Sequence, residues 1–199
     1  MAYSDFSLKE VSLRFGLTIE KKPFFDGVPE LAVSPTLETI LGYFEPLARS
    51  INTEKARSEF LIAPILAEVR LRLNNRVSLF SGIDFPAAPE QGLSGVCDFL
   101  MSRSPEQEFL VAPIITIVEA KKGDLKSGLG QCIAEMVGAR IFNEREGEKV
   151  FILFGVVTTG TLWQFLRLEE TVIDLDPREY QLERLSKILG ILAMMLDGK

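Results

Sequence analysis

Three charged side chains interrupt apolar stretches of the sequence at spacings that could support chemistry. Asp98 stands between GVC and FLM, and Glu119 and Lys121 end the run PIITIVEAK. Side chains of a β-strand alternate between its two faces, so Glu119 and Lys121, two residues apart, point the same way. An unpaired charge on a strand covered on both faces costs on the order of several kcal/mol. We therefore expect these charges to pair, to bind a cation or to line a cleft.

Composition narrows the chemistry that is available. The chain has 199 residues, 47% of them hydrophobic and 25% charged, which suits one compact domain with a substantial core. It contains no histidine, which excludes Ser-His-Asp hydrolases, Cys-His proteases, His-metal nucleases and most zinc catalysis. Cys97 and Cys132 lack zinc-ligand spacing and lie in apolar runs typical of small buried thiols. Carboxylate, lysine and hard-metal chemistry remain.

The elements around these residues are predicted to bring them together. Residues 102–108 form a polar turn with Pro105, so the Asp98 strand and the Glu119 strand are expected to be antiparallel neighbours. After Gly123 and Asp124 a helix is predicted over residues 127–143. On this helix Gln131 and Glu135 are four residues apart and share a face. The Gln131 side chain can therefore reach the end of the Glu119 strand.

This order of residues resembles the PD-(D/E)XK nuclease superfamily, whose fold is the restriction-endonuclease-like core. The resemblance lies in Asp98, then Glu119-Ala120-Lys121, then a helix carrying Gln131, and it covers about residues 52–167. It implies that Asp98 and Glu119 hold a divalent metal and that Lys121 positions or activates the attacking water. Gln131 stands where many relatives keep an active-site glutamine. Cys97 precedes the acid where the family pattern has proline.

The same resemblance implies a glutamate on the first core helix, aimed at the metal. A helix is predicted from a cap at Asn52 or Thr53 to about Leu73, with a kink at Pro64. It offers three glutamates, and the second and third cannot face one site because nine residues turn a helix by about 180°. The spacing to the next strand favours the second, with the third as fallback, and an exposed glutamate paired with an arginine is the structural alternative. The three are Glu54, Glu59 and Glu68.

The remaining pattern completes the predicted fold. A helix begins at Ser34-Pro35 and runs to about Leu47. Strands are predicted over residues 77–85 and 149–157, with a hairpin at Gly160 into residues 161–170. A capping box with proline at the first position predicts that the last helix begins at Asp176. We therefore expect an α/β fold with a restriction-endonuclease-like core, in which helices flank a central mixed β-sheet.

The predicted organisation is one domain over residues 1–199. Its parts are an N-terminal addition (1–50), the nuclease-like core (52–167) and a C-terminal helix (176–197). The N-terminus lacks a basic segment followed by an apolar core, and no apolar run approaches the roughly 18 residues of a membrane helix. We expect a cytoplasmic protein without a membrane partner.

The leading functional expectation is metal-dependent phosphodiester hydrolysis of DNA. Asp98 and Glu119 would hold Mg²⁺ or Mn²⁺, completed by the Ala120 carbonyl and Glu59 or a water. A formal charge of −6 argues against coating DNA by bulk electrostatics. The alternative is a catalytically silent nuclease fold that binds nucleic acid or protein within a larger assembly. For either function the expected partners are nucleic acid and a second copy of the chain or a larger complex. A third reading, a structural ion pair in an unrelated α/β enzyme, predicts that Asp98 lies far from Glu119.

Overall fold

A mixed eight-stranded sheet forms the centre of the protein, in a computed structural model that describes residues 1–197. The strands lie in the order β1-β7-β6-β5-β4-β3-β2, and the short β8 pairs with β6. The pairs β1–β7 and β4–β5 are parallel, whereas the other pairs are antiparallel. The strand bounds are β1 Thr18–Lys21, β2 Ser78–Asp84, β3 Val96–Ser102, β4 Ile114–Ala120, β5 Ile152–Thr158, β6 Leu162–Glu169, β7 Val172–Leu175 and β8 Tyr180–Gln181.

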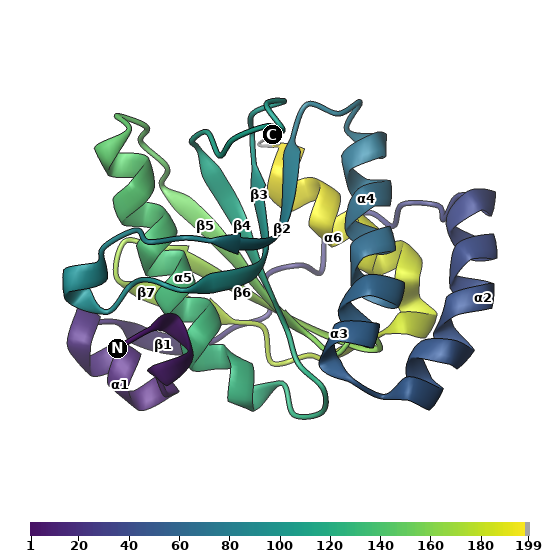
Figure 1. The fold of residues 1–199 in the computed structure, drawn as a ribbon, viewed down its shortest axis with the longest axis horizontal. Helices are drawn as coiled ribbons and strands as arrows, with labels where there is room; N and C mark the ends of the chain where they lie inside the picture. The colour runs from purple at the N-terminus through teal and green to yellow at the C-terminus, as the bar shows by residue number, and fades with distance from the viewer. Residues whose placement is uncertain (198–199) are drawn as a thin grey trace.

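Helices cover both faces of this sheet (Figure 1). Helices α1 and α5 lie on one face, and α2, α3, α4 and α6 lie on the other. The α/β class with a central mixed sheet flanked by helices is thus confirmed. The helix bounds are α1 Leu8–Phe15, α2 Pro35–Ile51, α3 Glu54–Arg57, α4 Ala63–Arg72, α5 Lys126–Arg145 and α6 Leu185–Asp197.

Each face of the sheet carries its own apolar core. On the α5 face Leu100 and Ile117 meet Ile133 and Val137, and on the α4 face Phe99 meets its neighbours from α4 and α6. Residues 1–50 enter both cores rather than standing outside them. Tyr3, Phe6 and Val11 are buried against α5, and Phe25, Leu37 and Leu41 are buried on the opposite face.

The helix that follows α2 is interrupted, and the sequence predicted its cap but not the form of the interruption. The Thr53 side chain caps it by accepting a hydrogen bond from the Ala56 N–H at 3.1 Å, as predicted. Pro64 has no N–H to donate to the preceding turn. Instead of a simple kink at Pro64, the helix widens into a π-helical turn over Ser58–Ile62, between α3 and α4. This turn carries Glu59.

The last helix begins later than its sequence pattern predicts, which corrects the expected span of 176–197. Asp176 lies in a turn between β7 and β8, and α6 starts only at Leu185. The fully buried Asp176 carboxylate accepts from the Arg178 backbone N–H and guanidinium and from the Tyr180 hydroxyl. Asp176 therefore caps a turn held by side chains, and its own N–H still pairs with Phe165 of β6.

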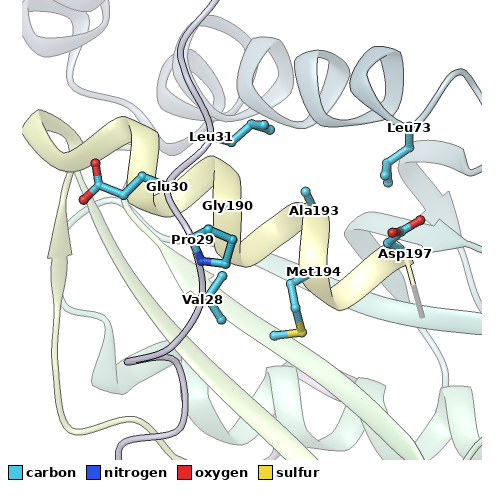
Figure 2. Close-up of a pocket in the computed structure, with 9 residues that line it drawn as sticks. All are labelled: Val28, Pro29, Glu30, Leu31, Leu73, Gly190, Ala193, Met194 and Asp197. Carbon is cyan, nitrogen blue, oxygen red and sulfur yellow. The ribbon is translucent and has the colours of Figure 1, made fainter. Parts of the chain in front are cut away.

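An apolar hollow of about 270 Å³ lies along α6, where the segment around Pro29 crosses the helix (Figure 2). Gly190 permits this crossing, because a Cβ there would overlap the Pro29 carbonyl oxygen. The hollow shares no lining residue with the pocket beside Asp98, so it is a separate feature of the α6 face. Among residues 1–197, no helix combines the length and the apolar character needed to cross a membrane.

Candidate active site

The candidate site forms where β3 and β4 separate. Their register ends with Phe99 opposite Val118, one residue before the two acids would face each other. There the Asp98 Oδ2 accepts a hydrogen bond from the Ala120 N–H at 2.8 Å. The Asp98 carboxylate thus replaces the next backbone hydrogen bond between β3 and β4. The prediction that these strands are antiparallel neighbours is confirmed, and Asp98 lies beside the Glu119 strand rather than far from it.

Glu119 and Lys121 share a face of the strand end, as their spacing predicted. Lys121 Nζ lies 2.5 Å from Glu119 Oε1 and donates a hydrogen bond to Gln131 Oε1 at 3.3 Å. The Lys121 backbone N–H donates to the Thr158 carbonyl at 2.8 Å, which extends the contact between β4 and β5 by one residue. The ammonium is therefore held by a carboxylate from its own chain segment and an amide from α5.

Burial perturbs the ionisation of this group. Glu119 is 1% exposed, and burial, reinforced by the charge of Asp98, raises its pKa to about 8 despite the opposing effect of Lys121. Burial also raises the pKa of Asp98, against the hydrogen bond from Ala120. For Lys121 burial acts to lower the pKa, but the hydrogen bond and charge of Glu119 outweigh it and raise the pKa. Two acids with raised pKa values beside one ammonium are typical of a functional site.

Glu135 belongs to the same cluster, although the sequence pattern assigned it no role. Its Oε1 accepts a hydrogen bond from Gln131 Nε2 at 3.1 Å, and its side chain is fully buried on α5. Burial, and next the charge of Glu119, raises its pKa well above the usual value. The i,i+4 spacing from Gln131 was visible in the sequence, but α5 is buried on nearly all sides, so periodicity could not mark this position as special.

The glutamates of the first core helix separate into two groups. Glu54 and Glu59 line a pocket of about 240 Å³ together with Asp98, from α3 and the π-helical turn. Glu59 is half exposed and lies 3.4 Å from Lys55 Nζ. After the larger effects of burial and of the contact between Glu119 and Lys121, the charge of Glu54 also acts to raise the pKa of both groups. Glu68, the fallback, bonds Arg72 and Ser34 instead and does not line this pocket.

The donor set fits a hard divalent cation held by few protein ligands. Glu119 Oε2 is buried and has no hydrogen-bond partner in the described part of the chain. Within residues 1–197, no three acids, cysteines or histidines gather closely enough to form a complete cage. Mg²⁺ keeps several waters and binds through one or two carboxylates, so Asp98 and Glu119 meet its needs. Ala120 follows Glu119 at the end of β4 and donates its N–H to Asp98.

These pKa shifts predict that the metal-free protein loses stability as pH rises. With raised pKa values, the folded chain binds more protons than the unfolded chain between the usual glutamate pKa and about 8. The free energy of unfolding therefore falls with rising pH across this window. We expect Glu135→Gln to remove part of the fall and to raise the melting temperature at about pH 8 by about 5 °C, equal to roughly 2 kcal/mol.

The measurement is thermal unfolding of the metal-free protein from about pH 5 to about pH 8.5. Glu144→Gln is the matched control, because Glu144 lies on the same helix and is exposed. Parallel stability curves for the wild type and Glu135→Gln would show that folding does not raise the pKa of Glu135.

Comparison with protein-family models returned no matching family, and a search among curated proteins returned no match.

Proposed function

We propose that this protein is a metal-dependent nuclease that hydrolyses phosphodiester bonds of DNA. The observation that carries the proposal is the convergence of Asp98, Glu119 and Lys121 at one strand end. Asp98 bonds the residue after Glu119, and Lys121 touches Glu119 directly. Two carboxylates for a hard cation beside an ammonium for phosphate form the minimal set for this chemistry.

The order of elements supports the same proposal at the level of the fold. The α3–α4 helix precedes β2, β3 and β4, and α5 then connects β4 to the parallel strand β5. This order is similar to the core of restriction-endonuclease-like nucleases, in which the acids and the lysine stand on the second and third core strands. Asp98 on β3 and Glu119 on β4 match those places.

Each side chain then has a role that its contacts permit. Asp98 and Glu119 would hold Mg²⁺ or Mn²⁺, with the Ala120 carbonyl and a carboxylate of the Asp98 pocket, Glu54 or Glu59, as further oxygen donors. When bound, such an ion lowers the pKa of water and offsets charge on a phosphodiester oxygen. Lys121 orients the attacking water and stabilises negative charge on the phosphate. Gln131 holds the ammonium of Lys121 in place.

The decisive experiment measures cleavage of plasmid and linear DNA with Mg²⁺ or Mn²⁺, with chelator as the negative control. Wild type, Lys121→Ala and Asp98→Ala are purified in parallel. Metal-dependent cleavage by the wild type alone supports the proposal, whereas equal cleavage by all three preparations indicates a contaminant and rejects it. Absence of both cleavage and a thermal shift with millimolar Mn²⁺ would favour the catalytically silent module.

Gly128 gives a further prediction, because it leaves room for the Lys121 side chain. A Cβ at Gly128 would lie 2.7 Å from Val157 Cγ1 and 3.1 Å from Lys121 Cε and Cγ. We expect Gly128→Ala to displace the lysine stem, to lower cleavage about 10-fold or more, and to destabilise the fold by about 1–3 kcal/mol.

Gly123→Ala is the matched control for this prediction. Gly123 is exposed in the preceding loop and has nothing within 4 Å of an added Cβ. Initial cleavage rates and melting temperatures of both variants are compared with the wild type. Equal rates for Gly128→Ala and the wild type would contradict the role given to the position of Lys121.

A further inference from the structure

A continuous line of polar contacts runs from the interior of α5 to the metal-binding carboxylate of the proposed site. Glu135 Oε1 accepts from Gln131 Nε2 at 3.1 Å, and Gln131 Oε1 accepts from Lys121 Nζ at 3.3 Å. Lys121 Nζ in turn lies 2.5 Å from Glu119 Oε1. The line joins α5 to β4 through side chains alone.

The orientation of the Gln131 amide decides whether this line holds. A side-chain amide has an acceptor oxygen on one side and a donor nitrogen on the other. If the amide were rotated by half a turn, its N–H groups would face the Lys121 ammonium. That arrangement is unfavourable, because the ammonium also has only donors. An acceptor at Glu135 selects the orientation in which the carbonyl oxygen faces Lys121. Either protonation state of the Glu135 carboxyl can supply that acceptor.

Glu135 is fully buried within α5, and its hydrogen bond goes to Gln131, so it reaches Lys121 through that amide. A buried carboxyl group is unfavourable for stability unless its polar atoms are satisfied. In the part of the chain that the structure describes, its second oxygen, Oε2, has no hydrogen-bond partner. A methionine would fill the same space at lower desolvation cost, so packing alone does not account for the carboxyl group.

We propose that Glu135 is a positioning residue: it fixes the Gln131 amide so that the amide oxygen holds the Lys121 ammonium against Glu119. This inference rests on the proposed nuclease function and adds a residue that acts only through Gln131. The acceptor atom, rather than the negative charge, is the feature of Glu135 that is needed.

The test is a double-mutant cycle in steady-state DNA cleavage with Mg²⁺. We expect Glu135→Met to lower kcat about 10- to 100-fold with little change in KM. Glu135→Gln keeps an acceptor oxygen and is expected to stay within about 3-fold of the wild type. In a Gln131→Ala background, Glu135→Met should lower kcat no further, because its effect passes through the missing amide.

Three outcomes would overturn the inference. A loss from Glu135→Met that is equal in both backgrounds would mark a general packing role. A loss from Glu135→Gln as large as that from Glu135→Met would show that charge, not the acceptor, matters. Full activity of Glu135→Met would show that Gln131 needs no support.

A second measurement keeps the inference testable without catalysis. NMR follows the exchange of the Gln131 side-chain amide protons with solvent, which should be slow in the wild type and Glu135→Gln. We expect exchange at least about 10-fold faster in Glu135→Met, and unchanged exchange would reject the inference. If the wild type does not cleave DNA, the proposed function is rejected. The NMR exchange of the Gln131 amide protons then decides whether Glu135 positions this amide.

Discussion

Lys121→Met is expected to abolish DNA cleavage while leaving metal binding intact. The ammonium lies 2.5 Å from Glu119, and among residues 1–197 no other cation forms an ion pair with either Glu119 or Asp98. Its removal takes away the positive charge that stabilises the phosphate in the transition state, so we expect cleavage to fall about 10³-fold. Glu119 Oε1 then loses its partner and is available to a cation, so Mn²⁺ should bind at least as tightly as to the wild type.

Initial cleavage rates and the thermal shift with Mn²⁺ test the two halves of this expectation. Lys149→Met is the matched control, since Lys149 is exposed near the start of β5, at the opposite end of the sheet. It removes the same charge and should leave the rate unchanged. A Lys121→Met protein that cleaves at the wild-type rate would exclude Lys121 from catalysis.

Asp98→Asn is expected to weaken metal binding and to suppress cleavage without unfolding the site. The asparagine oxygen can still accept the hydrogen bond from the Ala120 N–H, so the junction between β3 and β4 should persist. The substitution removes one of the two anionic ligands, so we expect Mn²⁺ affinity to fall at least about 10-fold and cleavage to fall about 10³-fold.

Asp98→Ala separates this chemical role from the structural one. It also leaves the Ala120 N–H without its acceptor, so it should cost a further 1–3 kcal/mol, roughly, of stability. Asp84→Asn serves as the control, because Asp84 is an exposed acid on the neighbouring strand β2. Unchanged Mn²⁺ binding in Asp98→Asn would remove Asp98 from the ligand set.

The part of the site built from strands could be predicted from sequence, because strand geometry is local. The spacing of Glu119 and Lys121 and the polar turn before β4 were enough to place the two acids side by side. Gln131 followed from its distance along the chain to the strand end. These predictions required only alternation of faces and a short connection between two strands.

The remaining parts depended on tertiary contacts. Asp176 matched a helix cap in sequence, but the buried Asp176 carboxylate bonds Arg178 and Tyr180 and holds a turn before the short strand β8 instead. Glu135 lies on a helix covered on nearly all sides, where apolar periodicity carries no information. The π-helical turn that carries Glu59 ends just before the turn that contains Pro64, and no pattern in the sequence specifies it.

The pairing of β1 with β7 has a consequence for how the chain acquires its structure. Thr18 lies opposite Val172, so β1 can pair with β7 only after the segments between these two strands have been synthesised. Such a distant pairing is slow to form, because the entropy cost of closing a long loop must be met before the strand contacts that offset it are made. Until then the unpaired edge of β7 is open to strand addition from another molecule. Once β1 pairs, the edge of the sheet moves from β7 to a strand of four residues that ends in Glu20 and Lys21, and a short, charged edge resists strand addition during biosynthesis.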